Sequence, residues 1–172
     1  LLLRTYAVNV IVGMWDDYWN NGNNYYLYFN SSDLDNYKVF LIPFDYDNTL
    51  GTSANCGVQS DSGRQDPLNW GDTNSNPLIG KLLQFEDFRK IYVDALNELC
   101  NPANDLFYYT HSIARIQGWH DMIRPYVDND TGEDCEIKDR PAGWGNIYDY
   151  RLLDENSPMN FFKVKASSIP SK

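Results

Sequence analysis

Residues 38–51 read KVFLIPFDYDNTLG, a β-prone apolar run that ends abruptly in two carboxylates. The apolar part, 38–44, is rich in β-branched and aromatic residues, which favour strands. Asp45 and Asp47 follow without a transition, and a strand continued through Asp47 would place both side chains on one face. Hard divalent cations prefer oxygen ligands, and Mg²⁺ commonly takes one or two carboxylates together with substrate phosphates. The pair Asp45-x-Asp47 is therefore a candidate metal site.

A second β-prone run lies upstream of the first. Residues 25–29 (YYLYF) are aromatic, and the segment between the two runs, NSSDLDNY, has the composition of a turn. The two runs therefore predict an antiparallel hairpin. Before the hairpin, the loop 16–24 (DDYWNNGNN) gathers carboxylates and amides, and it follows a helix that we expect over residues 1–13. This loop and the Asp45-x-Asp47 pair are the two features that can carry chemistry.

The rest of the chain is mainly helical by pattern. Apolar residues recur at helical spacing over residues 77–99, and a further helix is predicted from an N-cap at Asn104 to about Pro125. Residues 51–77 have the composition of a long loop, and residues 147–164 show no clear period. The expected fold is therefore α+β and mostly helical, with one small antiparallel hairpin.

Composition excludes several classes of protein. The 172 residues carry 14 Lys and Arg against 24 Asp and Glu, a formal net charge of −10. Nucleic-acid binding needs a cationic surface, so we expect no nucleic-acid partner. No window approaches the ~20 apolar residues that cross a bilayer, so we expect no transmembrane segment. An acidic protein that handles phosphate needs a metal ion to neutralise charge, which again directs attention to the carboxylate pair.

The cysteines and sequons carry weaker information. Cys56, Cys100 and Cys135 form no C-x-x-C pair, which disfavours zinc. One disulfide with a free thiol and three buried thiols are both compatible with this spacing. Sequons begin at Asn30 and Asn129 and favour a secreted protein only weakly.

Three strings resemble a known family: GMWDDY at 13–18, NNYYLYF at 23–29 and FLIPFDYDNTLG at 40–51. Their order is a helix, an Asp loop with Asn, a hairpin and an acidic metal motif, which resembles the catalytic half of protein kinases. The H-R-D and D-F-G strings themselves are absent. The chain is similar to the CotH kinase family of spore-coat-protein-H-like atypical kinases, with a W-D-D-Y-like loop, an N-Y-Y-L-Y strand and an I-P-[WFY]-D-x-D-x-T-x-G signature. The likeness covers roughly residues 1–127.

The resemblance implies roles for residues of the first loop. Asp16 would be the catalytic-loop Asp that receives the substrate hydroxyl proton, with Asp17 a close competitor. Asn24, which heads the N-Y-Y-L-Y strand, or Asn21, five residues beyond Asp16, would assist with metal binding or positioning.

The resemblance also implies the cofactors and the reaction. Asp45 would be the principal Mg²⁺ ligand, and Asp47 a second acidic ligand or a structural neighbour. The implied activity is Mg²⁺-dependent transfer of the ATP γ-phosphoryl group to a Ser or Thr hydroxyl of a protein substrate. The implied location is extracellular, at the cell surface or in the spore coat.

The resemblance further implies one domain over residues 1–172, a protein-kinase-like C-terminal lobe. Kinases also have a glycine loop over the nucleotide and a strand lysine paired with a helix glutamate. Neither precedes the first loop here, so we expect a lobe truncated at its N-terminus, with those parts upstream.

Two other interpretations remain open. Residues 39–50 also fit the first motif of haloacid-dehalogenase-like phosphatases, in which Asp45 would be the nucleophile and Asp47 the general acid/base. That fold requires a later apolar strand ending in Ser or Thr, which the sequence after Gly51 does not predict. The alternative is a catalytically inactive structural or binding module with a kinase-like fold. A carbohydrate-binding version would use the tryptophans as stacking platforms: Trp15, Trp19, Trp70, Trp119 and Trp144.

Overall fold

The computed structural model describes residues 1–52, 61–126, 139 and 149–170. The helices in these ranges are α1 (Leu2–Ile11), α2 (Tyr18–Asn21), α3 (Pro77–Leu82), α4 (Glu86–Cys100), α5 (Tyr109–Ile123) and α6 (Phe161–Ser167). The strands are β1 (Tyr25–Asn30) and β2 (Lys38–Pro43), which pair antiparallel. Short 3₁₀ turns connect them: η1 (Leu34–Asn36), η2 (Pro67–Asn69), η3 (Pro102–Asn104) and η4 (Arg124–Tyr126). The fold is α+β and mostly helical with one small hairpin, as predicted.

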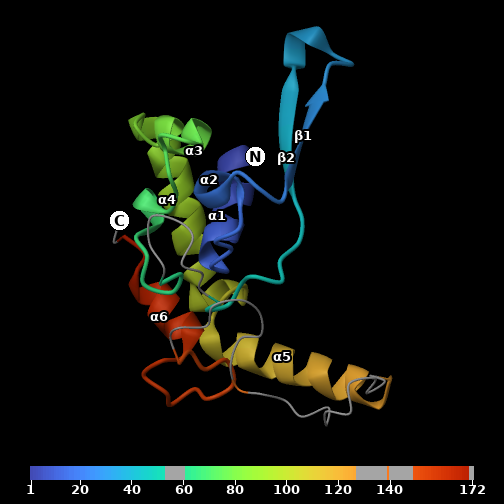
Figure 1. Ribbon diagram of the computed structural model, residues 1–172, viewed down its shortest axis with the longest axis vertical. Coiled ribbons are helices and arrows are strands. Elements are labelled where there is room, and N and C mark those ends of the chain that lie inside the picture. Colours follow the sequence, from blue (N-terminus) through green and yellow to red (C-terminus); the bar gives the residue numbers. More distant parts are fainter. Residues whose placement is uncertain (53–60, 127–138, 140–148, 171–172) are drawn as a thin grey trace.

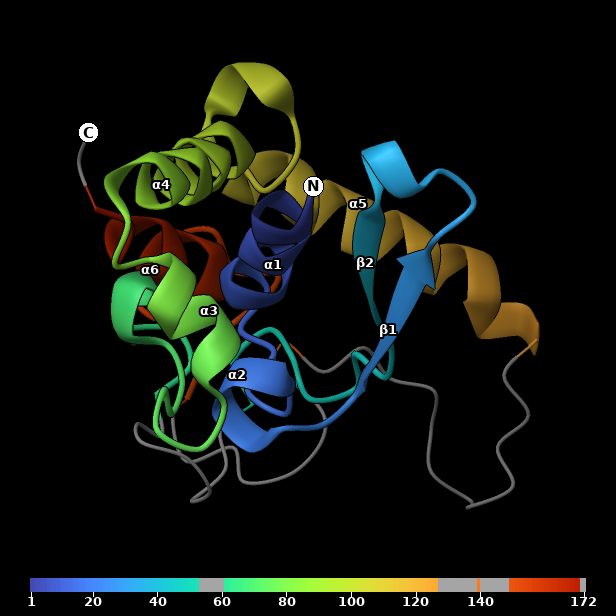
Figure 2. The ribbon, with the colours of Figure 1, turned by 90° about the horizontal axis from the view of Figure 1, so that it is seen from above.

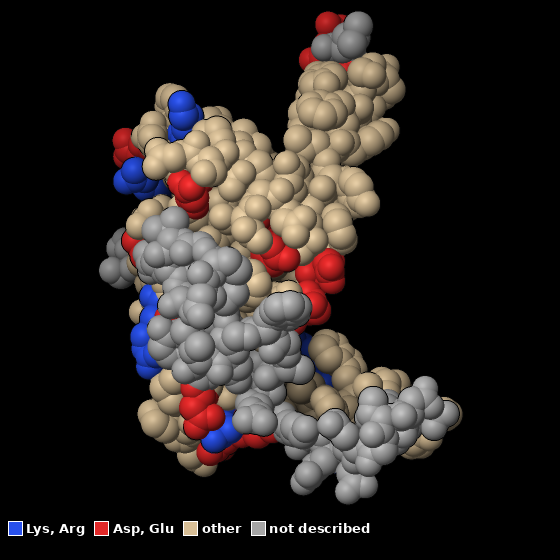
Figure 3. Space-filling model, viewed as in Figure 1, with Lys and Arg blue, Asp and Glu red and all other residues tan. Residues whose placement is uncertain are grey.

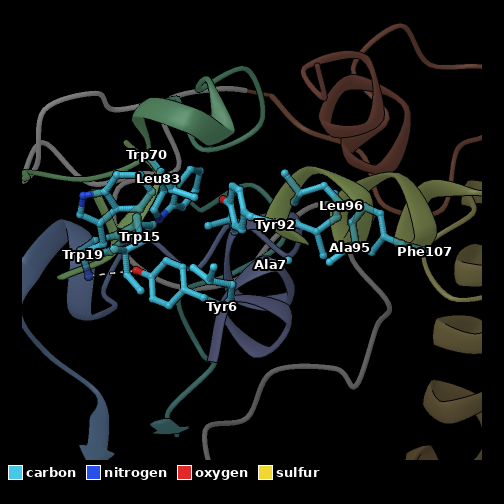
Figure 4. Packing of buried hydrophobic residues seen from close by; sticks show 14 of the residues in the cluster. Tyr6, Ala7, Trp15, Trp19, Trp70, Leu83, Tyr92, Ala95, Leu96 and Phe107 are labelled. Carbon is cyan, nitrogen blue, oxygen red and sulfur yellow. Dashed lines mark hydrogen bonds between the residues drawn. The ribbon is translucent and has the colours of Figure 1, made fainter. Parts of the chain in front are cut away.

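The helical body is built on the packing of α1 against α4 (Figures 1 and 2). In α1 the buried apolar residues recur three or four positions apart, which gives the helix one core-facing stripe. The buried apolar residues of the two helices are Leu3, Tyr6, Ala7, Val10 and Ile11 from α1 and Tyr92, Ala95 and Leu96 from α4. The larger of these side chains each contribute about 1.5–3 kcal/mol when fully buried, and the two alanines less. Figure 4 shows Tyr6 and Ala7 beside Tyr92, with Trp19 and Trp70 closing the cluster at one end.

The hairpin projects away from this body and joins it at its foot (Figure 1). Tyr25 pairs with Pro43 at the foot, and Asn30 pairs with Lys38 near the tip. Leu41 is buried in the core cluster, whereas large apolar side chains on both strands are exposed: Tyr26, Leu27, Tyr28, Phe29, Val39 and Ile42. The foot of the hairpin therefore lies next to α1. The Asp16 loop directly precedes β1, and the Asp45–Asp47 pair directly follows β2.

The helices differ from the sequence prediction at two places, the start of α5 and the unpredicted helix α6. The prediction that Asn104 caps the third long helix is wrong: α5 begins at Tyr109. Asn104 instead ends η3, and its side-chain amide donates to the carbonyl of Glu98 in α4 at 3.0 Å. Asp105 then adopts a left-handed conformation with φ 50°, which separates the turn from α5. The second difference is α6, which begins after Asn160, whose side chain accepts a hydrogen bond from Lys163 N.

The tryptophans are mostly part of the core. Trp15, Trp19 and Trp70 are buried, so their faces are not free to stack on sugars, whereas Trp119 on α5 is exposed. Cys100 carries a free thiol in the described part of the chain. Four sequence features lie outside the described residues: Cys56, Cys135, Trp144 and the sequon at Asn129. Among the described helices, none combines the length and the apolar character needed to cross a membrane.

Candidate functional site

The site is built where α1 ends and the chain reverses. Gly13 has φ +71°, a left-handed conformation that glycine adopts without steric cost. A Cβ on Gly13 would also lie 2.9 Å from the ring of Phe161. After this turn the indole nitrogen of Trp15 donates to Thr52 Oγ1 at 3.2 Å, which fixes the start of the loop. Asp16 and Asp17 follow directly, and their side chains differ in burial: Asp17 is buried and Asp16 is partly exposed.

Asp17 lies in the interior and caps α2. Its carboxylate accepts hydrogen bonds from the backbone N–H of Asn20 at 2.9 Å, from Trp70 Nε1 at 3.2 Å and from the Tyr6 hydroxyl. That hydroxyl also accepts from the backbone N–H of Trp19 at 2.9 Å, which Figure 4 marks with a dashed line. Burial raises the pKa of Asp17 to about 7, although the hydrogen bonds oppose the shift. The arrangement holds α2 and the start of the loop against the core.

Asp16 is only half-buried, and side-chain amides surround its carboxylate. Asn21 Nδ2 donates to Oδ1 at 2.6 Å, and Asn24 Nδ2 donates to Oδ2 at 3.0 Å. Asn23 Nδ2 lies 3.3 Å from Oδ2. Amide donors stabilise the ionised form of a carboxylate and fix its orientation. Asp16 is thus an oriented and accessible acceptor.

Asn24 joins this loop to the end of β2. Its φ of 53° is left-handed, a conformation that asparagine tolerates better than most residues. Its side chain holds Asp16, while its backbone carbonyl accepts from the N–H of Phe44 at 3.2 Å. Phe44 immediately precedes Asp45. One residue therefore contacts both the Asp16 carboxylate and the backbone that leads into the acidic pair.

The acidic pair lies in a turn, so the condition under which strand alternation would align the two side chains, a strand continued through Asp47, is not met. β2 ends at Pro43, and Asp45 has φ 61°, so strand alternation does not extend to Asp47. Both carboxylates are exposed. Figure 3 shows acidic side chains gathered below the foot of the hairpin, over the segment that follows β2.

The turn is anchored to the carboxyl end of α1. The hydroxyl of Tyr46 donates to Asn9 Oδ1 at 2.6 Å, and Thr49 Oγ1 donates to the Tyr46 carbonyl at 2.8 Å. Leu50 N donates to the carbonyl of Val12 at 2.7 Å. Partial burial, and then the charge of Asp17, raise the pKa of Tyr46 to about 12, so its hydroxyl remains a donor at neutral pH.

Asn48 adds an unpartnered oxygen to the turn. The side chain is 7% exposed, and its Nδ2 donates to Asp47 Oδ1 at 3.1 Å. Its Oδ1 is buried without a hydrogen-bond partner, which is costly unless another group satisfies it. In the described ranges, no three or more His, Cys, Asp or Glu side chains cluster in a way that could hold a metal. The donor types in this turn, two carboxylates and one amide oxygen, are nevertheless those that Mg²⁺ prefers, together with water and phosphate oxygens.

Sequence reasoning identified the two loops but missed the residues that support them. Asn48 directly follows Asp47 in the string D-Y-D-N, and its position as an oxygen donor next to the two acids is a signal that identifies it. Trp70 and Tyr6 carry no local signal, because their contacts with Asp17 cross 53 and 11 positions of sequence. Two cavities of about 650 and 270 Å³ lie along the carboxyl-terminal half of α4, and neither is lined by Asp16, Asp45 or Asp47.

Comparison with known proteins places these features in a family. No curated protein and no solved structure matches the chain. A family model described as CotH kinase protein matches residues 2–151. The matched span contains α1, the Asp16 loop, the hairpin and the Asp45–Asp47 turn, in the order that the sequence resemblance required. The chain therefore belongs to the CotH kinase protein family.

Proposed function

We propose that this chain carries out Mg²⁺-dependent transfer of the ATP γ-phosphoryl group to a Ser or Thr hydroxyl of a protein. The observation that carries the proposal is the position of Asn24, which binds the Asp16 carboxylate and the backbone next to Asp45. Phosphoryl transfer needs mainly positioned groups and neutralised charge, and these two contacts support a role for Asp16 as a proton acceptor that acts with the acidic turn.

Asp16 is the better candidate for the acceptor of the substrate hydroxyl proton. Its carboxylate is accessible and is oriented by amides, as such an acceptor must be. Asp17 is fully buried, and its oxygens already accept from Tyr6, Trp70 and Asn20. A substrate hydroxyl would have to displace these donors to reach Asp17. The burial of Asp17 therefore supports the assignment of Asp16 as the proton acceptor.

Asp45, Asp47 and Asn48 are the residues that would hold Mg²⁺. A bound Mg²⁺ would neutralise charge on the phosphate oxygens of ATP. The anchoring of Tyr46 on Asn9 would keep the turn in place. The contacts of Asn21 and Asn24 with Asp16 support a positioning role for both amides.

The proposal extends to the organisation of the protein. The described helices and the hairpin share one core, which supports a single catalytic lobe over the chain. The family likeness supports a protein substrate and a location outside the cell, at its surface or in the spore coat. The phosphatase interpretation lacks support, since the described residues after Gly51 contain no strand other than an isolated bridge between Arg151 and Asn160.

Transfer of label from γ-labelled ATP to a protein acceptor tests the proposal. Wild-type protein should transfer label only with Mg²⁺, and Asp16→Asn and Asp45→Asn should each lose most of the activity. Asp35→Asn, at the exposed tip of the hairpin, is the matched control and should retain it. Nucleotide binding without transfer would indicate an inactive module, and a stable aspartyl-phosphate at Asp45 would indicate a phosphatase.

A further inference from the structure

Lys165 is a lysine whose side chain is fully buried in the core. It lies on α6, and its Nζ donates to the carbonyl of Ser62 at 3.1 Å. The same Nζ lies 4.3 Å from the centroid of the Trp70 ring. Among the described residues, no carboxylate forms an ion pair with it. Burial of a lysine without a carboxylate partner is costly, so the position calls for an explanation.

Trp70 connects this lysine to the site. Its side chain is completely buried, and its ring faces Lys165. Its Nε1 donates to Asp17 Oδ2 at 3.2 Å, and its carbonyl accepts from the side-chain amide of Gln65. The indole is therefore in contact with Lys165 through its face and with a carboxylate through its N–H.

In its protonated form, the ammonium group of Lys165 strengthens both contacts of the indole. The ring face carries partial negative charge and attracts the ammonium group. Withdrawal of electron density from the ring makes the N–H a stronger donor, and hydrogen-bonded chains in a low-dielectric interior reinforce one another. Asp17 receives this N–H and caps α2, and Asp16 is its chain neighbour.

We propose that Lys165 is a positioning residue that acts through Trp70 and Asp17 to hold the Asp16 loop in place. An effect of Lys165 on catalysis rests on the proposed function. Its effect on the position of the loop does not, because it depends only on the contacts among Lys165, Trp70 and Asp17. α6 lies beyond residues 2–151, the span that the family model matches. Lys165 therefore supports the site from a helix that lies outside the matched span.

Hydrogen exchange tests the link without requiring activity. Three backbone N–H groups donate to groups of this loop or of its support: Trp19 to the Tyr6 hydroxyl, Asn20 to the Asp17 side chain and Asn21 to the Asp17 carbonyl. Their exchange rates therefore measure how firmly the loop is held. In the full chain, Lys165→Met and Trp70→Phe should each accelerate their exchange by about two- to thirty-fold relative to amides in α4. Trp70→Phe keeps a ring but removes the N–H donor.

The double variant and two controls decide between positioning and general loosening. If Lys165 acts through the Trp70 N–H, the double variant exchanges no faster at these amides than the faster single variant. Lys165→Arg, which keeps a cation, should restore slow exchange. Val164→Ala removes buried volume from the same helix and should lower global stability without selective acceleration in the loop. Unchanged exchange in Lys165→Met, or multiplicative effects in the double variant, would overturn the proposal.

Kinetics then separates this inference from the proposed function. In an active protein, Lys165→Met should lower kcat by about tenfold or less and leave KM for ATP unchanged, since only the orientation of Asp16 is altered. If wild-type protein transfers no phosphate, the proposed function fails, and the exchange experiment alone still decides whether Lys165 positions the loop.

Discussion

Asn24 donates its side-chain amide to Asp16 Oδ2 at 3.0 Å, and its carbonyl accepts from the residue before Asp45. The left-handed φ of Asn24 makes this double contact possible, because it turns the chain from the loop into β1. The relationship means that the proposed proton acceptor and the proposed metal ligands are held by the same residue. A change at Asn24 should therefore affect catalysis more than folding.

Asn24→Gly removes the amide without adding backbone strain, since glycine adopts a φ of 53° freely. Asp16 then keeps its contacts with Asn21 and Asn23 but loses one of the amides that orient its carboxylate, so we expect kcat to fall by about ten- to a hundredfold. The unfolding free energy should fall by only about 1 kcal/mol. Asn30→Gly, at the other end of β1, is the control. Equal kcat values for the two variants would refute a supporting role for Asn24.

The proposed role of the Asp45–Asp47 turn in metal binding leads to a separate prediction. Titration of Mg²⁺ in the presence of a non-hydrolysable ATP analogue should show a weaker affinity by about tenfold or more in Asp45→Asn and in Asp47→Asn. Asn48→Ala removes the buried unpartnered Oδ1 and should weaken binding by a similar factor. Asp33→Asn, on an exposed carboxylate near the hairpin tip, controls for the loss of one negative charge. Wild-type affinity in Asn48→Ala would exclude that oxygen as a ligand.

The hairpin and the first loop were predictable because their signals are local. Aromatic runs flanked by turn residues place β1 within one residue of the prediction, and Asp16, Asn21 and Asn24 fall within nine positions of one another. Asn104 was misjudged because an N-cap and a C-terminal cap use the same side chain. In the structure its amide donates to a carbonyl at the end of α4. The left-handed conformation of Asp105 separates Asn104 from α5, so Asn104 does not cap that helix.

The support of the site was not predictable for the opposite reason. Trp70 and Asp17 are 53 positions apart, and Lys165 contacts Ser62 across 103 positions. No spacing rule relates residues at such separations, and α6 lies where apolar residues lack a clear period. The geometry of the acidic pair also escaped prediction, because the φ of Asp45 depends on how the turn docks on α1.

The two buried charges predict an unusual dependence of stability on pH. Burial raises the pKa of Asp17 from 3.8 to about 7, so its contribution to stability is complete below pH 3.8 and lost as pH rises through 7. Burial lowers the pKa of Lys165 from 10.5 to about 7, so its contribution is complete above pH 10.5 and lost as pH falls through 7. Together the two groups contribute least near pH 7.

Urea denaturation across pH checks this prediction by comparison with variants. The stability of Lys165→Met relative to wild type should be most favourable at pH 7 and below, and that of Asp17→Asn at pH 7 and above, with a variation across pH on the order of a few kcal/mol. Asp17→Asn keeps a residue that can cap α2. A difference from wild type that does not change with pH would show that neither group titrates in the stated windows.

Gly71 and Gly118 provide a matched pair for the coupling between the core and the loop. A Cβ at Gly71 would lie 2.4 Å from the backbone carbonyl of Trp19, whereas a Cβ at Gly118 meets nothing within 4 Å. Gly71→Ala should therefore cost about 1–3 kcal/mol of unfolding free energy, and because Trp19 belongs to α2 it should also lower kcat. Gly118→Ala lies in α5 and should add about 0.5–1 kcal/mol with unchanged kcat, since alanine favours helices. Urea midpoints and transfer rates measure both effects, and a Gly71→Ala protein with normal kcat would show that α2 can shift without moving Asp16.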